Sequence, residues 1–296
     1  PWVAGRPFGH QFGILAQPRA DRTAPRPFGL VLLNAGAVRH TGPNRMWVEA
    51  ARRSAGRGIP VLRLDIEGLG DSDGDGRPYV DTARLYAPGL AEQVSESVSE
   101  LVRDGVADHW IVAGLCAGAS WAFHAALADD DRVTSVILIN PFAFFFDEEL
   151  VVEHDMAAAR RAGYRSAWQR VVAGEIDADR LRATAVRVAR TPLDARARRR
   201  RSRARIAQTD AALDRLRERG KHVTLIVGQD EPIILRLQDD GHLDRLGEWP
   251  NVDLQRIPAR DHTFRAPWLQ RVVHGLLDEA VDAELERRGQ PAPLLS

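Results

Sequence analysis

Short apolar runs separated by helical patterns constrain the fold of this chain most strongly. Each run is bounded by turn residues, and several are apolar without alternation, as expected for strands covered on both faces of a sheet. Between them, apolar residues recur at the spacing of an amphipathic helix. This alternation predicts an α/β protein, with a mostly parallel sheet and helices on both faces. The expected strands lie at residues 12–17, 29–33, 59–66, 109–113, 133–139, 223–227 and 252–257.

Strand signals disappear between residues 147 and 219, where the sequence is polar and rich in arginine. We expect residues 147–219 to form a helical cap, inserted into an α/β core made of residues 1–146 and 220–296. The densest basic run, Arg196–Arg205, is open to two interpretations: a patch for nucleic acid or phosphate, or a solvated helix face. We favour the helix face, because acidic residues flank the run and the whole chain carries no net charge.

The composition excludes several classes of protein. With 44% hydrophobic and 28% charged residues, the 296-residue chain has the balance of a globular protein with a sizeable core. Its 41 basic and 41 acidic residues cancel, so we expect neither nucleic acid nor a membrane as partner. We also expect no membrane-spanning segment and no signal peptide. The single cysteine excludes an intrachain disulfide, which fits a cytoplasmic location; the oligomeric state stays open.

That cysteine lies in the segment Gly114-Leu115-Cys116-Ala117-Gly118, between a predicted buried strand and a helix of small residues. A G-x-nucleophile-x-G turn at this place holds its central residue in a strained conformation above the sheet. The dipole of the helix that begins there favours a thiolate, the reactive form of cysteine. The N–H of Ala117 would face a developing oxyanion. We therefore predict that Cys116 is a nucleophile; the alternative is a small buried apolar residue.

A nucleophile needs a base, and His262 is the best placed of the nine histidines. It follows the last predicted strand and precedes the last helix, so a loop can bring its imidazole over the sheet. The alternative is an ordinary histidine on a surface loop. His109 precedes its strand, at the wrong end of the sheet, and His124 and His274 lie within predicted helices.

An acid that orients the base is predicted after the strand at 223–227. The turn there places two adjacent carboxylates, Asp230 and Glu231, at the carboxyl end of the penultimate strand. Glu231 is our first choice and Asp230 is nearly as good. Either one could instead serve at the N-terminus of the next helix, a common position for acidic residues.

The order along the chain, nucleophile then acid then base, on alternating strands and helices, resembles the α/β-hydrolase superfamily over residues 12–285. The segment that begins at Asp65 resembles a D-x-x-G-x-G-x-S turn that this family carries one strand before the nucleophile strand. In the family that turn is structural, so we assign no chemistry to Asp65 or Asp71.

The resemblance also implies an oxyanion hole. The segment 34–37 occupies the place of the family's oxyanion loop, so the N–H of Ala37, or of Gly36, is implied as the second donor beside Ala117. The neighbouring His40-x-Gly-Pro-x-Arg segment, together with residues 261–264, is similar to a bacterial subgroup that includes exosortase-system-associated hydrolases.

The nucleophile departs from the family pattern, since most members carry serine where this chain has Cys116. Cysteine occurs in dienelactone hydrolases and in some thioesterase-like enzymes. It implies a thioester acyl-enzyme, which water or another nucleophile can resolve. We expect hydrolysis or acyl transfer on an ester, thioester or lactone. Two alternatives stay open: elimination or cyclisation in secondary metabolism with His262 as base, and a binding protein without turnover on the same scaffold.

The expected partner is a small-molecule acyl substrate, free or attached to a carrier. Aromatic residues cluster where the sheet gives way to the predicted cap, and they form either an apolar pocket wall or hinge packing. We expect no metal and no organic cofactor, because no phosphate-binding loop or complete dinucleotide motif is present. The residues expected to bind substrate are Phe142, Phe145, Phe146 and His40.

Overall fold

The computed structural model describes residues 2–8, 10–18, 27–128, 131–146 and 195–289. The chain divides into two compact units, one formed by residues 1–144 and 211–296, the other by residues 145–210. Most of the predicted cap, residues 147–194, lies outside the described residues, so the division into core and cap stays a prediction. None of the helices within the described residues is long and apolar enough to cross a membrane.

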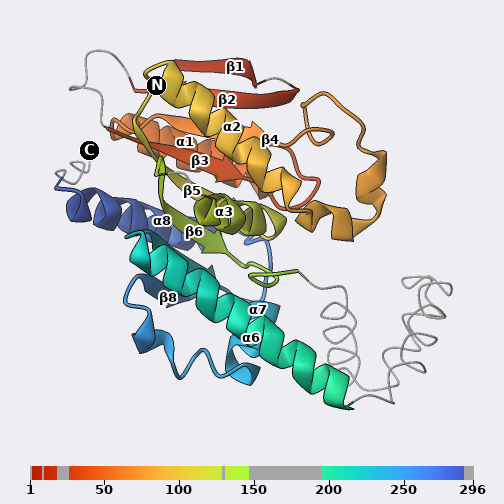
Figure 1. Ribbon diagram of the computed structural model, residues 1–296. Helices are drawn as coiled ribbons and strands as arrows, with labels where there is room; N and C mark the ends of the chain where they lie inside the picture. Colours follow the sequence, from red (N-terminus) through yellow and green to blue (C-terminus); the bar gives the residue numbers. More distant parts are fainter. Residues whose placement is uncertain (1, 9, 19–26, 129–130, 147–194, 290–296) are drawn as a thin grey trace. The chain divides into compact units, whose positions relative to one another are not determined.

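Eight strands form a single sheet (Figure 1). They are β1 (Trp2–Phe8), β2 (Gln11–Gln17), β3 (Phe28–Leu33), β4 (Val61–Asp65), β5 (His109–Leu115), β6 (Val133–Ile139), β7 (His222–Val227) and β8 (Val252–Arg256). The α-helices are α1 (Met46–Gly56), α2 (Gly89–Arg103), α3 (Ala117–Leu127), α6 (Ala195–Glu218), α7 (Pro232–Asp239) and α8 (Pro267–Arg287). Short 3₁₀ helices lie at η1 (Pro43–Arg45), η2 (Arg77–Val80), η3 (Thr82–Tyr86) and η4 (Leu246–Glu248).

The strand order is β1-β2-β4-β3-β5-β6-β7-β8. The pairs β1–β2 and β2–β4 are antiparallel, and all the others are parallel. The mostly parallel α/β sheet predicted from the sequence is therefore confirmed. The first strand was not among the predicted ones.

Burial explains the apolar runs of the central strands. Every residue of β3, β4 and β6 is buried, as expected for strands covered on both faces. Strand β8 pairs only with β7 and is half-exposed along its length, with Asp253 and Gln255 among its residues. Its polar sequence suits a sheet edge, where charged side chains discourage pairing with another chain.

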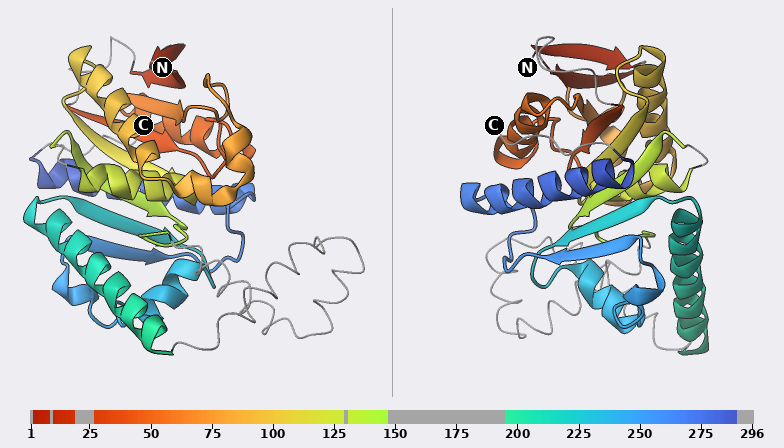
Figure 2. Two further views of the ribbon diagram at one scale, coloured as in Figure 1. Left: turned by 45° about the vertical axis from the view of Figure 1, so that its right-hand side comes forward. Right: turned by 90° about the vertical axis from the view of Figure 1, so that its left-hand side faces the viewer.

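Helices cover both faces of this sheet. Figure 2 shows α1 and α8 on one face and α2 and α3 on the other. The apolar core includes three fully buried tryptophans, Trp47, Trp110 and Trp249. Helix α3 consists mostly of alanine and other small or apolar residues and is almost wholly buried, which lets it pack closely against the strands beneath it.

The two ends of α3 are both held in place. At its C-terminal end, the buried ammonium of Lys221 donates hydrogen bonds to the carbonyls of Ala126, at 2.8 Å, and Ala128, at 3.5 Å. A positive charge there complements the helix dipole and satisfies carbonyls that the helix itself leaves without donors. The other end begins at Ala117, directly after the cysteine. Since parallel strands end at the same edge of a sheet, the segments after β3, β5, β6, β7 and β8 meet there.

Candidate active site

The backbone at Cys116 turns sharply between β5 and α3. Its φ is 55° and its ψ is −113°, a conformation that residues other than glycine rarely adopt. The Cys116 N–H donates to the Ile139 carbonyl at 2.9 Å, and the Cys116 carbonyl accepts from the Ala119 N–H at 3.1 Å. The side chain is half-buried, so the thiol is not sealed in the core. The strained turn predicted from the sequence is present, and strain of this kind concentrates at functional sites.

The two glycines of this turn are required by close backbone contacts. A Cβ on Gly118 would lie 2.5 Å from the Asn34 carbonyl oxygen and 2.8 Å from the Leu33 carbonyl group. A Cβ on Gly114 would collide with the carbonyl of Gly118. The Gly118 N–H donates to the Asn34 carbonyl at 3.0 Å. The cysteine turn and the segment after β3 are thus fastened directly to each other.

The structure brings Cys116, His262 and Glu231 together, although they come from three distant parts of the sequence. A hydrogen bond and opposite charges couple the Cys116 thiol to the His262 side chain, so that each shifts the pKa of the other. His262 Nδ1 lies 2.7 Å from Glu231 Oε2. The Glu231 side chain is only 5% exposed, whereas that of His262 is 41% exposed. The imidazole thus lies between a buried carboxylate and the sulfur.

Of the two candidate acids, only Glu231 faces the imidazole. Asp230 has a φ of 63°, and its carboxylate forms an exposed ion pair with Arg260 at 3.1 Å. Glu231 occupies the N-cap position of α7, yet its side chain makes no capping hydrogen bond there. Its carboxylate is directed to His262 instead, so the capping role considered for it is not the one that the structure shows.

The electrostatics of this group favour an ion pair. Burial by itself raises the pKa of the Cys116 thiol, but hydrogen bonds from His262, Tyr86 and the Ala117 N–H, with the charge of His262, outweigh burial and lower it. Burial by itself lowers the pKa of His262, but Cys116 and Glu231 raise it to about 10. Both pKa shifts favour a thiolate beside an imidazolium over the neutral pair, and the thiolate is the reactive form of cysteine.

Asn140 joins the loops that carry the acid and the base. It follows β6 directly, is fully buried and has a φ of 44°. Its Nδ2 donates to the His262 carbonyl at 2.7 Å, and its Oδ1 accepts from the Gly228 N–H at 2.7 Å. A single amide thus ties the segment before Glu231 to the segment of His262.

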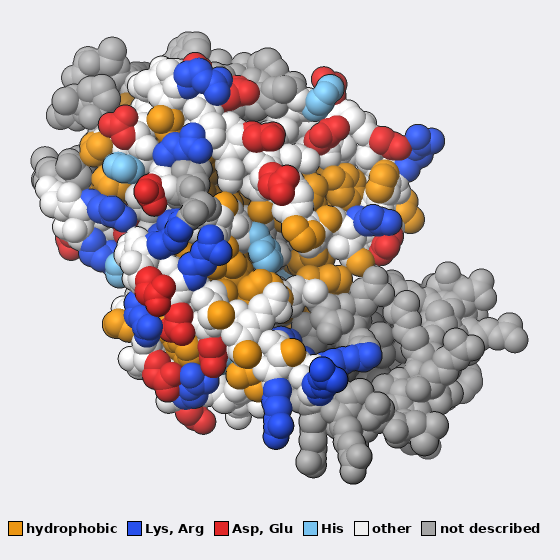
Figure 3. Space-filling model, in the orientation of Figure 1, with side chains coloured by type: hydrophobic (Ala, Val, Ile, Leu, Met, Phe, Trp, Pro, Cys, Tyr) orange, Lys and Arg blue, Asp and Glu red, His pale blue; other side chains and the backbone are white. Residues whose placement is uncertain are grey.

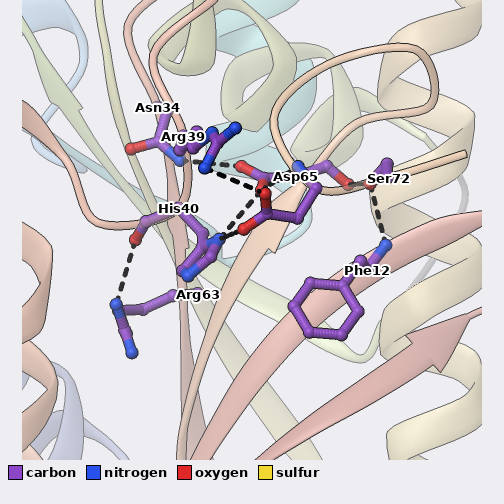
Figure 4. A network of polar contacts seen from close by, with 8 residues as sticks. Phe12, Asn34, Arg39, His40, Arg63, Asp65 and Ser72 are labelled. Atoms are coloured by element: carbon purple, nitrogen blue, oxygen red, sulfur yellow. Dashed lines mark hydrogen bonds and ion pairs between the residues drawn. The ribbon is translucent and has the colours of Figure 1, made fainter.

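A polar network beside the site organises the segment after β3 (Figure 4). At its centre is Asp65, the last residue of β4, whose side chain is 1% exposed. Asp65 Oδ2 accepts from His40 Nδ1 at 2.9 Å and from the Asp71 N–H at 3.0 Å. Asn34 Nδ2 lies 3.5 Å from Asp65 Oδ1. Because Asn34 also holds Gly118, Asp65 supports the cysteine turn indirectly, which fits the structural role expected for its motif.

His40 belongs to this network. Its side chain is 11% exposed and its Nδ1 is bound to Asp65, so a role in binding substrate stays a prediction. His40, Asp65 and Asp71 are the one group of metal-ligand type found among the described residues. A cation at this group would bind the Asp65 carboxylate, but that carboxylate already accepts hydrogen bonds from His40 Nδ1 and the Asp71 N–H.

The predicted oxyanion donors lie in the turns after β3 and β5. A hydrogen bond from the Ala117 N–H contributes to the lowered pKa of the Cys116 thiol. Gly36 and Ala37 lie in the turn after β3, where Gly36 has a φ of 51° and Ala37 is exposed. Which of these two supplies a second donor stays a prediction.

The predicted aromatic residues have different surroundings. Phe142 is half-buried, and its ring centroid lies 6.4 Å from that of Tyr86. Phe144 is buried and stacks on Phe123 at 4.7 Å, which is core packing. Phe145 and Phe146 are half-buried and belong to the second unit, so their role at the site stays a prediction. Figure 3 shows hydrophobic side chains gathered around a recessed histidine on one face of the molecule.

Two residues of the site were not predicted from the sequence. Tyr86, the last residue of η3, places its hydroxyl 3.7 Å from the Cys116 sulfur. It lies in a segment without periodicity, so no sequence signal marks it. Asn140 could have been found, because it is a polar residue immediately after a buried strand, at the edge where the site residues meet.

Comparisons with known proteins give the fold. No family model matches the sequence, and no curated protein matches it. Among solved structures, a dienelactone hydrolase from Anabaena variabilis is similar with a TM-score of 0.55 and 16% identity, over 94% of this chain and 95% of that one. A proline iminopeptidase from Mycobacterium smegmatis gives 0.58 and 18%, over 94% and 98%.

A third similar structure is an α/β serine hydrolase without lid from Xanthomonas campestris, with a TM-score of 0.53 and 18% identity over 98% of this chain and 96% of that one. The narrower similarity to exosortase-associated hydrolases stays a prediction, as does the cysteine nucleophile. Strand order, the turn at Cys116 and these three structures agree on the architecture. This chain has the α/β-hydrolase fold.

Proposed function

We propose that this protein is an acyl-transfer enzyme of the hydrolase type, with Cys116 as nucleophile, His262 as acid and base, and Glu231 as the residue that orients the imidazole. The observation that carries the proposal is the grouping of three features: a thiol on a strained turn, an imidazole electrostatically coupled to it, and a buried carboxylate 2.7 Å from that imidazole. A structural cysteine needs none of these three features. A base and an orienting acid are what an activated nucleophile requires.

In the proposed reaction, the Cys116 thiolate attacks the carbonyl carbon of an ester, thioester or lactone, and a carbon–sulfur bond forms. The carbonyl π electrons move to oxygen, where the Ala117 N–H and a donor from Gly36 or Ala37 bind the negative charge. As the bond to the leaving group breaks, the imidazolium of His262 gives that group a proton. The product is a thioester acyl-enzyme.

In the second half, neutral His262 removes a proton from water or another acceptor, which attacks the thioester. The tetrahedral intermediate collapses, the acyl product leaves, and the sulfur departs as a thiolate beside a reprotonated imidazole. The thiolate and imidazolium are thereby restored, and no cofactor is consumed. Hydrolysis and acyl transfer differ only in the acceptor.

The proposed substrate is a small molecule with a hydrophobic acyl group, free or attached to a carrier. The half-buried ring of Phe142 lies against Tyr86, which itself touches the sulfur, so one wall near the nucleophile is aromatic. A dienelactone hydrolase and a ferulic-acid-bound protein are among the similar structures, which makes aromatic esters and lactones reasonable first probes.

The test is turnover of a panel of acyl thioesters, aromatic esters and lactones by the wild type, Cys116→Ala and Cys116→Ser. We expect wild-type turnover that Cys116→Ala lowers by at least about three orders of magnitude, since removal of a nucleophile costs most of the catalysis. Cys116→Ser should retain part of it. The exposed His10 provides a matched control: His262→Asn should be inactive and His10→Asn should equal the wild type.

Turnover that survives in Cys116→Ala would overturn the nucleophile assignment and favour the elimination or cyclisation alternative. Absence of turnover on the whole panel, in folded protein whose Cys116 also resists acylating probes, would favour a binding protein on this scaffold.

A further inference from the structure

We propose that the Tyr86 hydroxyl is a catalytic hydrogen-bond donor to the Cys116 sulfur, which holds that sulfur as a thiolate in the resting enzyme and releases it when the sulfur is acylated. The proposal rests on the proposed function, in which Cys116 is the nucleophile. It adds a third side chain to the site, beside His262 and Glu231, and this side chain comes from a different segment of the chain. The supporting contact is the 3.7 Å distance between the hydroxyl oxygen and Sγ.

Tyr86 is held firmly in this position. Its 3₁₀ helix, η3, is capped by Asp81, whose carboxylate accepts from the Ala83 N–H at 3.1 Å. The next residue inward, Leu85, is buried, and its carbonyl accepts from Trp121 Nε1 at 2.5 Å. Trp121 lies on α3, the helix that begins directly after Cys116. The hydroxyl and the sulfur are therefore anchored to the same helix.

Charge decides which of the two atoms donates. His262, with hydrogen bonds from Tyr86 and the Ala117 N–H, lowers the pKa of the Cys116 thiol, which favours the sulfur as the acceptor. Burial and the neighbouring negative charge raise the pKa of Tyr86, so its phenol keeps its proton. The hydrogen bond therefore runs from oxygen to sulfur. A hydrogen bond to a charged acceptor is stronger than one between neutral groups.

This donor changes the reactivity of the sulfur in two opposite ways. It stabilises the thiolate, so more of it is present at low pH. It also withdraws electron density, and the intrinsic nucleophilicity of a thiolate falls with its pKa. When the sulfur's electron pair forms the bond to the acyl carbon, the negative charge leaves the sulfur and the hydrogen bond weakens. Tyr86 thus favours a well-populated but less nucleophilic thiolate over a more nucleophilic thiolate that is present only in a small fraction of molecules.

Cys116 is the only cysteine in the sequence, so alkylation by iodoacetamide reports on this sulfur alone. The experiment measures the alkylation rate against pH for the wild type and Tyr86→Phe. The variant should show a midpoint raised by about one unit, the size expected for a hydrogen bond to a charged group. Its rate should be roughly threefold higher on the plateau, because each thiolate is more nucleophilic. On the acidic limb it should be roughly threefold lower, because a tenfold smaller thiolate fraction outweighs that gain.

Tyr79→Phe is the matched control, because the Tyr79 hydroxyl donates to the Glu67 carbonyl at 3.1 Å rather than to the sulfur. Its profile should match the wild type. Trp121→Phe, which removes the hydrogen bond to Leu85, is a second variant and should raise the midpoint in the same direction. It keeps the test decisive if Tyr86→Phe does not fold.

An unchanged midpoint in Tyr86→Phe would overturn the proposal. An alkylation rate lowered equally on the acidic limb and on the plateau would also overturn it. A merely structural role slows alkylation at every pH, whereas loss of the hydrogen bond slows it at acidic pH and speeds it on the plateau. The two proposals fail differently. If alkylation of the wild type has its midpoint at the pKa of an ordinary thiol, the proposed function is contradicted. If the wild-type midpoint is low and Tyr86→Phe has the same midpoint, only the role of Tyr86 is contradicted.

Discussion

Replacing Glu231 by Gln removes a buried negative charge from His262 while keeping the size of the side chain. The carboxylate lies 2.7 Å from Nδ1, and hydrogen bonds to charged groups contribute about 1.5–3 kcal/mol. Because the His262 side chain is 41% exposed, solvent screening favours the lower end of that range. At 1.36 kcal/mol per unit, the loss lowers the pKa of His262 by about one unit.

The assay is NMR titration of histidine side chains in isotope-labelled protein, with His262→Asn used for assignment. In the wild type, Cys116 and Glu231 raise the pKa of His262 to about 10, and the titration should show this shift from the ordinary value. In Glu231→Gln its pKa should fall by about one unit. Asp230→Asn is the matched control, because Asp230 pairs with an exposed arginine; it should leave the titration unchanged.

The same pKa fixes the sign of a stability effect. The folded pKa of His262 lies above its ordinary value of 6.5. Its charged form therefore stabilises the fold fully below about pH 6.5, and this contribution is lost as the pH rises through about 10. Glu231→Gln should shift that loss to lower pH. A titration unmoved by Glu231→Gln, or moved equally by Asp230→Asn, would refute the assignment of the acid.

Two further substitutions test the backbone that presents these groups. Gly118→Ala places a Cβ 2.5 Å from the Asn34 carbonyl oxygen, so it should lower the free energy of unfolding by about 1–3 kcal/mol and slow Cys116 alkylation. Gly275→Ala in α8 is the control, because open space surrounds Gly275, and it should raise the free energy of unfolding by about 0.5–1 kcal/mol. Denaturant melts measure both effects. Asn140→Ala removes both hydrogen bonds that join the two loops, so it should cost about 1–3 kcal/mol and lower turnover beyond the effect of stability alone, measured well below the melting temperature. A neutral Gly118→Ala, or an Asn140→Ala enzyme with full turnover, would contradict the respective roles.

Much of the fold could be predicted because a strand that is buried on both faces of a sheet has a continuous apolar sequence. The apolar runs of β3, β5, β6 and β7 are short and bounded by turn residues, which is typical of strands covered on both faces. Strand β1 has no such continuous apolar run. It contains Gly5 and Pro7, which read as turn residues, and it is a strand only because β2 pairs with it along its whole length.

The site was predictable in outline, because strand order brings certain loops together. Cys116 and His262 were found from their places after predicted strands. The choice between Asp230 and Glu231 was not decidable, because it depends on a backbone turn: the positive φ of Asp230 accompanies its side chain's ion pair with Arg260. Tyr86 was not predictable at all, since its position depends on a tertiary hydrogen bond from Trp121 to Leu85.

The most direct test of the account is the covalent intermediate itself. The protein is mixed with an activated acyl ester, quenched in acid within milliseconds to seconds, and analysed by intact-mass and peptide mass spectrometry. The account predicts one added acyl group, located on Cys116, absent in Cys116→Ala and discharged at the rate of turnover. Turnover without any adduct on Cys116, or an adduct on another residue that Cys116→Ala leaves in place, would contradict it.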